Sequence, residues 1–177
     1  MVPWSEVVQQ HGPLVWQTVY QLVRREADAA DCFQNTFLAA LELSRRQTIR
    51  HWPALLKRVA TTQALNRLRQ RLRETRRVRP LGDEPGTSRE APPEQAARAA
   101  ELSDRLALAL AEIEPRQAEV VALACLDDWS YQEIAAELRI TVNHVGVLLN
   151  RARAALRDRL RAFDPQDQRQ AAAGDSP

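Results

Sequence analysis

Long apolar runs are missing from this 177-residue chain, as are other features that mark particular protein classes. No run approaches the roughly 18–20 residues that a membrane span needs, and the longest, 106–111 and 120–126, suit core helices. Glycine is scarce, aromatic residues are few, and Ala, Leu, Arg and Gln dominate. This composition predicts helices throughout. The N-terminus lacks a basic-then-apolar signal, so we expect a cytoplasmic protein.

Residue patterns for catalysis and for metal binding are also absent. Cys32 and Cys125 are far apart, and no nearby Cys or His has a spacing that suits zinc. Each cysteine is therefore expected to be a small buried hydrophobe. We find no nucleophile–base pair, no paired carboxylates in an apolar pocket and no phosphate loop. The sequence predicts neither an enzyme nor a cofactor.

Charge is distributed unevenly although the net charge is only +2. Residues 1–79 hold 14 Arg and Lys against 6 Asp and Glu, a net charge of +8. Residues 102–163 hold 8 against 9, a net charge of −1. A basic N-terminal half favours nucleic acid as a partner.

Proline and glycine gather in one segment, PLGDEPGTSREAPPEQ (80–95), which has no apolar period. Such a segment is typical of a flexible acidic linker and marks a domain boundary. We predict an N-terminal domain over 1–79, a linker over 80–97 and a C-terminal domain over 98–163. A disordered tail follows over 164–177.

Apolar residues recur at helical spacing in the first domain. The pattern predicts helices over 4–23 and 28–43, with the first one broken at His11-Gly12-Pro13. A polar, basic loop covers 44–51. A long helix then begins near Pro53, which suits the first helical position, with Trp52 extended before it.

The second half of that long helix is rich in arginine. Seven arginines fall within 67–79, and only Glu74 opposes them. A solvated face is one explanation. Arginines crowded on one helix repel each other, however, and phosphates would relieve that repulsion.

The stretch Trp129 to Leu160 contains two helical periods separated by a three-residue break. Ser130 and Glu133 form a capping box for the first helix, and Thr141 can cap the second. Ala135 permits a close crossing of the two helices, and apolar residues at Ile140, Val145 and Leu148 would fix it. The pattern favours a helix-turn-helix over an ordinary helical hairpin.

In a helix-turn-helix the second helix enters the major groove of DNA. Its predicted exposed face supplies candidate base contacts and two candidate phosphate contacts. The base candidates are Asn143, His144, Val147, Asn150 and Arg151, and the phosphate candidates are Thr141 and Arg153. For His144 and Arg153 an ordinary solvated position is the alternative, as it is for Arg157 and Arg159.

Several segments together resemble bacterial RNA polymerase sigma factors of the sigma-70 family, specifically the two-domain extracytoplasmic-function type. The resemblance covers 5–79 and 98–162. Three segments carry it, ADAADCFQNTFLAAL (27–41), WPALLKRVATTQALNRLRQRLR (52–73) and LALALAEIEPRQAEVVALACLDDWSYQEIAAEL (106–138), followed by VLLNRARAALRDRL (147–160). It implies an all-α fold of two small helical domains. The C-terminal one would be a helix-turn-helix of winged-helix-like, four-helix sigma type.

The resemblance also implies partners and sites. The first segment resembles the helix that docks on the polymerase, with Asp28, Asp31, Gln34, Asn35 and Leu38 as its contacts. The second resembles the helix that captures and melts the −10 element. Its implied DNA contacts are Arg50, Trp52, Arg58, Thr62, Asn66, Arg69, Arg71 and Arg73. For Trp52 a core aromatic is the alternative. Core RNA polymerase and promoter DNA are the implied partners, and an anti-sigma factor is left open.

Some positions depart from the family pattern. Thr62 replaces a usual Asn, Asn66 replaces a usual Asp, and Leu55 replaces a frequent Trp. Arg139 replaces a Gly in the turn, which is strained if that position needs a positive φ. In the recognition helix, Gly146 and Leu148 replace common basic residues. Asn35 likewise stands where an acidic residue is usual.

We therefore predict a sigma factor that recognises −10 and −35 elements. Two alternatives remain. One is a helix-turn-helix regulator that acts without polymerase. The other is a sigma-derived interaction protein that no longer melts promoters, as the residues at 62 and 66 suggest.

Overall fold

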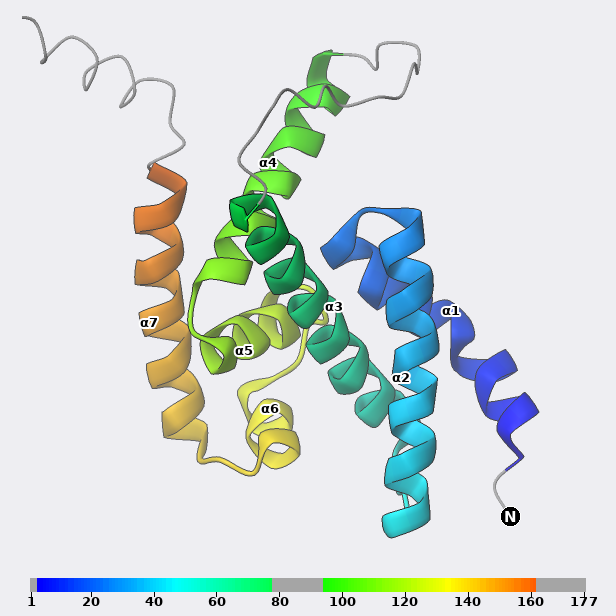
Figure 1. Ribbon diagram of the computed structural model, residues 1–177. Coiled ribbons are helices and arrows are strands. Elements are labelled where there is room, and N and C mark those ends of the chain that lie inside the picture. Colours follow the sequence, from blue (N-terminus) through cyan, green and yellow to red (C-terminus); the bar gives the residue numbers. More distant parts are fainter. Residues whose placement is uncertain (1–2, 78–93, 162–177) are drawn as a thin grey trace, which may run out of the picture.

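The computed structural model describes residues 3–77 and 94–161. Over these residues the chain is helical and contains no strand, so the predicted all-α class is confirmed. Seven helices follow one another in the described ranges (Figure 1): α1 Trp4–Val23, α2 Glu26–Arg46, α3 Trp52–Arg77, α4 Glu94–Glu112, α5 Pro115–Cys125, α6 Tyr131–Leu138 and α7 Val142–Arg161.

Helices α1, α2 and α3 form the N-terminal domain and all three contact one another. Their apolar residues recur every three to four positions and meet in a common core. Val15 and Val19 of α1 are fully buried there, beside Leu56 and Leu65 of α3. Burial of these faces removes apolar surface from water, which drives the three helices together.

Helix α1 continues through Pro13, so the predicted break at His11-Gly12-Pro13 is wrong. Val7 before the proline and Val15 after it are buried in the same core, and this packing holds both halves of the helix in line. Gly12 is buried next to the Phe33 ring, which is 3.7 Å from where a Cβ would lie. Tertiary packing therefore outweighs the local proline signal.

The N-terminus of α3 is capped by a residue that sequence patterns did not single out. His51 Nδ1 accepts a hydrogen bond from the Ala54 backbone N–H at 3.2 Å. This satisfies one of the amide groups that a helix start leaves without a partner. Trp52 is the first helical residue, and Pro53 follows it in the first turn.

Helices α4 to α7 form the C-terminal domain, in which α5, α6 and α7 carry the helix-turn-helix core. Val120, Leu123, Ile134, Val145 and Leu149 are buried at their junction. The four-helix form of the prediction is thus confirmed, and no wing strand occurs in the described ranges.

The predicted caps of the helix-turn-helix are confirmed. The Ser130 hydroxyl accepts from the Glu133 N–H, and the Glu133 carboxylate accepts from the Ser130 N–H at 2.8 Å. Thr141 Oγ1 accepts from the His144 N–H at 3.2 Å. Arg139 ends α6 with φ 53°, so this position does need the left-handed backbone that glycine adopts most easily.

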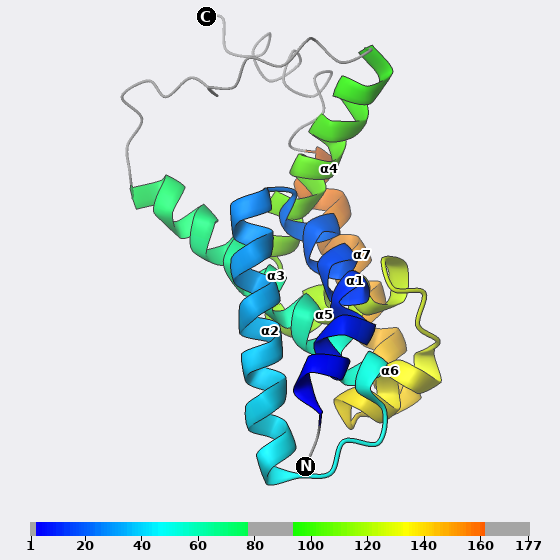
Figure 2. The same cartoon turned by 90° about the vertical axis from the view of Figure 1, so that its right-hand side faces the viewer.

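Helix α3 lies between the two domains (Figures 1 and 2), and it contacts α4 and α5 as well as α1 and α2. The buried apolar side chains of both domains belong to one contiguous cluster. Helix α4 begins at Glu94, inside the segment 80–97 that was predicted as a linker. The rest of that segment, 80–93, and the predicted tail over 164–177 lie outside the described residues.

The two cysteines differ in environment. Cys32 is buried in the core, as predicted, but Cys125 at the end of α5 is exposed, so that prediction is wrong. Cys125 is the last residue of α5, one turn beyond the buried Val121, so it lies where the helix leaves the core. Among the described helices, none is long and apolar enough to cross a bilayer.

Candidate nucleic-acid interface

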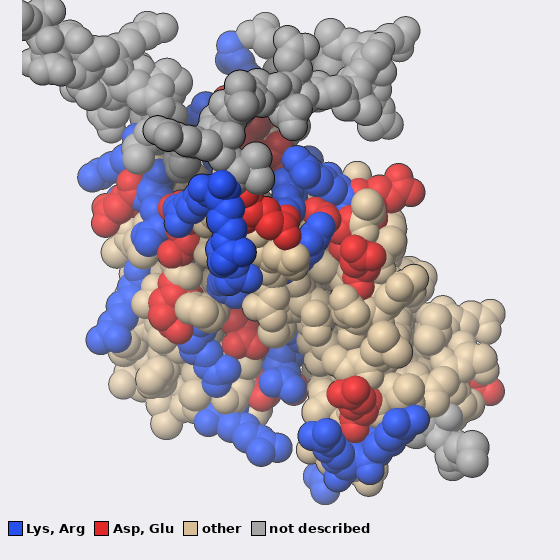
Figure 3. All heavy atoms as spheres, in the orientation of Figure 1, with Lys and Arg blue, Asp and Glu red and all other residues tan. Residues whose placement is uncertain are grey.

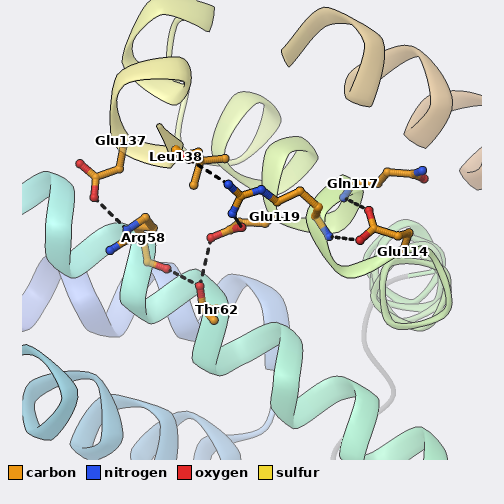
Figure 4. A network of polar contacts seen from close by, with 8 residues as sticks. Arg58, Thr62, Glu114, Gln117, Glu119, Glu137 and Leu138 are labelled. Carbon is orange, nitrogen blue, oxygen red and sulfur yellow. Dashed lines mark hydrogen bonds and ion pairs between the residues drawn. The ribbon is translucent and has the colours of Figure 1, made fainter. Parts of the chain in front are cut away.

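Four predicted −10 contacts form one stripe along α3. Arg58, Thr62, Asn66 and Arg69 are spaced by four, four and three residues, which places them on the same face of a helix. This face points at α5 and α6 of the C-terminal domain (Figure 4). We call these four residues the α3 stripe.

Two acidic residues of the C-terminal domain contact the stripe directly. Arg58 Nε lies 2.8 Å from Glu137 Oε1 at the end of α6. Thr62 Oγ1 lies 3.3 Å from Glu119 Oε1 on α5, and it also donates to the Arg58 carbonyl at 2.9 Å. Figure 4 shows both carboxylates pointing across the interface toward α3.

Arg116 on α5 holds the two acidic helices together. Its Nη1 lies 3.1 Å from Glu119 Oε2, and its Nη2 donates to the Leu138 carbonyl at 2.9 Å. That carbonyl is at the C-terminus of α6, where the helix leaves its last acceptors without intrahelical partners. Arg116 therefore fixes Glu119 and the end of α6 in one arrangement.

Arg69 sits in a cavity of about 310 Å³ between the domains. Glu114, Arg116 and Glu119 line its other wall. Burial lowers the pKa of the Arg69 guanidinium, while the charges of Glu114 and Glu119 act in the opposite direction. Its Nη1 reaches only Asn66 Oδ1 at 3.4 Å, and its buried Nε and Nη2 find no hydrogen-bond partner in the described ranges.

A second polar contact joins the start of α3 to the loop before α6. Lys57 Nζ lies 3.1 Å from Asp127 Oδ1, and Thr61 Oγ1 lies 3.4 Å from Asp127 Oδ2. Burial raises the pKa of Asp127, although Lys57 opposes this shift by its charge and its hydrogen bond. These two α3 residues are one turn apart and flank the stripe.

The opposite side of α3 binds within its own domain. Arg67 and Arg71 both reach Asp28 of α2, with Arg67 Nη2 at 2.6 Å from Oδ1 and Arg71 Nη1 at 3.5 Å from Oδ2. Arg71 Nη1 also donates to the Val23 carbonyl at the end of α1. The hydrogen bond to Asp28 is the main cause that raises the pKa of Arg67.

Asp28 is therefore 5 % exposed and joins α2 to α3, rather than presenting its carboxylate to a partner. Arg71, predicted to contact DNA, is engaged in the same cluster. Burial, together with the Asp28 charge, raises the pKa of the neighbouring Cys32 thiol to about 11. The arginine run is thus balanced by carboxylates on other elements, which sequence proximity to Glu74 alone does not reveal.

The remaining −10 candidates differ in exposure. Arg50 and Arg73 are exposed. Arg76, near the end of α3, pairs with Glu112 of α4 at 2.6 Å, and Glu112 also pairs with Arg159 of α7. Figure 3 shows Lys and Arg gathered over α7 and the end of α3, with Asp and Glu among them.

Trp52 packs edge-on against Trp4 of α1, with ring centroids 5.3 Å apart and planes at 86°. It is partly buried against the core cluster. This contact matches the alternative that Trp52 is a core aromatic. Leu55, at the position of a frequent Trp in the resemblance, is buried as well.

The predicted DNA face of α7 is exposed. All seven predicted −35 residues are exposed: Thr141, Asn143, His144, Val147, Asn150, Arg151 and Arg153. Val147 leaves 39 % of its surface open, whereas Val145 and Leu148 of the same helix are buried. The structure brings these residues onto one outward face.

The predicted polymerase contacts lie on α2. Asp31, Gln34, Asn35 and Leu38 are exposed, and their spacing of three, one and three residues places them on one face. Leu38 leaves 59 % of its surface open. Asp28 lies on the buried side of the same helix, so the structure does not bring it together with the other four.

Sequence reasoning missed the acidic half of the interdomain contact. Glu119, Asp127 and Glu137 had no motif, and their partners lie 57 to 79 residues away along the chain. A weak signal was present in the composition, because the C-terminal domain is acidic enough to complement the basic N-terminal one.

Two family matches decide what this pair of domains is. Residues 7–74, which cover α1 to α3, match the family described as Sigma-70 region 2. Residues 103–156, which cover most of α4 to α7, match the family described as Sigma-70, region 4. The chain belongs to the sigma-70 family. The α3 stripe is in its region 2, and the exposed face of α7 is in its region 4.

Individual relatives agree with this assignment and with the extracytoplasmic-function (ECF) group. The chain is 29 % identical over 160 residues to "ECF RNA polymerase sigma factor SigE" of Mycolicibacterium smegmatis, covering 90 % of this chain and 62 % of that protein. The chain thus spans less than two thirds of the length of this curated relative. Sigma factors are not enzymes, in agreement with the sequence prediction.

Solved structures share the fold. CnrH, in a complex with the cytosolic domain of CnrY, is 26 % identical to this sigma factor with a TM-score of 0.55, covering 91 % of this chain and 89 % of that chain. The sigma factor RpoE, in a complex with the anti-sigma factor NepR from Bartonella quintana, is 18 % identical with a TM-score of 0.52, covering 91 % and 98 %. The second likeness concerns the fold alone.

Proposed function

We propose that this sigma factor binds core RNA polymerase and directs promoter-specific transcription initiation by recognising −10 and −35 elements. The observation that carries the proposal is the outward face of α7. Its seven exposed candidates follow a capped turn that presents the second helix of a helix-turn-helix to a major groove.

Base recognition would come from the amides and the guanidinium on that face. Asn150 and Arg151 supply side chains that form two hydrogen bonds with adenine and guanine edges, respectively. Thr141 and Arg153 would bind phosphates and set the register. Val147 has an open methyl surface that suits the thymine methyl group.

Polymerase would bind the exposed face of α2, through Asp31, Gln34, Asn35 and Leu38. Polymerase binding would remove the exposed apolar surface of Leu38 from water. Asp28 would act indirectly, because its ion pairs with Arg67 and Arg71 position α2 on α3. Such a role takes place in the cytoplasm.

The −10 element would be held by the stripe of α3 and by Arg50 and Arg73. Guanidinium groups bind the backbone of a separated strand. Thr62 and Asn66 offer hydroxyl and amide groups where the family more often has Asn and Asp, so strand opening would use different hydrogen-bonding groups at these two positions. An anti-sigma factor is a further proposed partner.

Reconstitution tests the proposal. Purified full-length protein is added to core polymerase and linear genomic DNA fragments, and transcripts are mapped. We expect transcripts with fixed starts that depend on the protein. Binding to core without any transcript would favour the sigma-derived interaction protein instead.

A charge reversal on α2 distinguishes the proposed sigma factor from a helix-turn-helix regulator that acts without polymerase. Asp31→Lys should reduce core binding and transcription while leaving duplex binding intact. A helix-turn-helix regulator that acts without polymerase would keep its full activity with this substitution. Glu6→Lys, an exposed charge reversal on α1, is the matched control.

A further inference from the structure

The surface of α3 that the proposed function assigns to single-stranded DNA is occupied by this chain's own C-terminal domain. Arg58 and Thr62 contact Glu137 and Glu119, and Arg69 faces Glu119 and Glu114 across a narrow cavity. DNA phosphates and these carboxylates would bind the same side chains of the α3 stripe, so they cannot occupy it at the same time.

We propose that Glu119 and Glu137 form an autoinhibitory contact that competes with the phosphate backbone of single-stranded DNA for the α3 stripe. This inference rests on the proposed function, since it takes the stripe to be a strand-binding surface. Two carboxylates, one on α5 and one on α6, close the same face from the C-terminal domain.

The carboxylates are held in position rather than placed by chance on a flexible surface. Arg116 binds both Glu119 and the Leu138 carbonyl, one residue from Glu137. Glu137 and Glu119 are only partly exposed, at 26 % and 14 % of their side chains. A pre-organised pair of acceptors loses little conformational freedom on meeting Arg58 and Thr62.

The polar contacts between the α3 stripe and the two carboxylates are individually weak. Ion pairs open to solvent shift an equilibrium by about fivefold or less each. Arg69 has two buried donor atoms without a partner in the described ranges, and this unfavourable state ends when the interface opens to water or phosphate. A ligand that binds only the open form therefore shifts the population.

Opening would also separate apolar side chains, because the buried residues of both domains form one contiguous cluster. Each domain keeps buried residues of its own, such as Val19 in the first and Leu149 in the second. The segment between α3 and α4 joins the two domains covalently. The competition concerns the α3 stripe, whereas the seven −35 candidates are exposed.

The test measures binding of a fluorescein-labelled oligothymidylate to the full chain by anisotropy. The wild type is compared with Glu119→Gln/Glu137→Gln, which removes the acceptor charges and leaves the stripe intact. The control Glu6→Gln/Glu101→Gln removes the same charge from exposed sites on α1 and α4. Circular dichroism and unfolding midpoints verify that all three proteins are folded.

We expect the double variant to bind about fivefold more tightly than the wild type, and the control to change by less than about twofold. Equal affinity in all three proteins, or no binding by any of them, would overturn the proposal. An equal gain in variant and control would also overturn it, because bulk charge would then explain the effect.

A second readout separates this inference from the proposed function. Transcription with core polymerase is measured for the same three proteins. Tighter oligonucleotide binding without any transcript would leave the autoinhibitory contact standing and remove the sigma activity. If the wild type gave transcripts but the double variant bound the oligonucleotide no more tightly than the wild type, the sigma activity would stand and the autoinhibitory contact would be overturned.

Discussion

The two helices with proposed DNA faces, α3 and α7, have opposite surroundings in the free chain. The stripe of α3 is contacted by Glu119 and Glu137, while the seven candidates over 141–153 at the start of α7 are exposed. On α3 the stripe meets carboxylates of the other domain, whereas the first nine residues of α7 carry no Arg, Lys, Asp or Glu.

Helix α3 contacts three different parts of the molecule through three different faces. In α3 an apolar face fills the core, Arg67 and Arg71 bind Asp28, and the stripe meets α5 and α6. Helix α7 buries one face through Val145 and Leu149 and leaves the other unoccupied. Substitutions should therefore affect stability on α3 and DNA binding on α7.

The largest effect is expected from Asp28→Asn. It leaves two partly buried guanidinium groups without their carboxylate, so the free energy of unfolding should fall by about 3 kcal/mol. Urea denaturation followed by circular dichroism measures this change. The exposed Asp31→Asn is the control and should stay within about 0.5 kcal/mol of the wild type. Equal stabilities would mean that the cluster does not hold α2 on α3.

On α7 the expected effect is on binding. Arg151→Ala should weaken binding to a −35 duplex by about 2 kcal/mol if its guanidinium reads a base. Its unfolding midpoint should not move, because the side chain is exposed. Titration of a promoter duplex checks this, with the exposed Arg24→Ala as the control for charge. If Arg24→Ala weakened binding as much, α7 would not be the reading helix.

The effect of Gly146→Ala on thermal stability tests whether the space beside this part of α7 is empty. A Cβ at this position meets nothing within 4 Å, and the residue lies inside a helix. The substitution should stabilise the chain by about 1 kcal/mol, because alanine has the higher helix propensity. Thermal unfolding measures the gain. Loss of stability would show that the space above Gly146 is filled.

The smallest effect concerns the cap of α6. Hydrogen bonds from the Ser130 side chain and backbone lower the pKa of Glu133. Because the folded pKa is depressed, the cap stabilises α6 above the ordinary glutamate pKa and is lost as the pH falls through the folded value. Carbon NMR titration of the carboxyl group checks this. In Ser130→Ala the pKa of Glu133 should return toward its ordinary value, and an unchanged value would contradict the capping explanation.

Local signals predicted much of the fold. The Ser130–Glu133 box and the Thr141 cap depend on residues three positions apart, so their chemistry can be read from the sequence. The seven exposed candidates on α7 follow from helical periodicity in the same way. The family match then extends over both domains.

Long-range contacts could not be predicted because they depend on how the helices pack. Pro13 argued for a break that packing overrides, and Cys125 reads as a core residue although it ends its helix at the surface. Asp28 matches a polymerase-contact motif, yet its distance from Arg67 is visible only in three dimensions. Charge pairing across 57 or 79 residues leaves no local pattern.

The central claim is that the free chain closes α3 with its own C-terminal domain. Double electron–electron resonance tests it most directly. It measures the distance between a spin label on the exposed Cys125 and a second label at Gln10→Cys on α1. We predict one narrow distance distribution for the wild type, which becomes broad in Glu119→Gln/Glu137→Gln and on addition of oligothymidylate. A distribution equally broad in all three samples would contradict the claim.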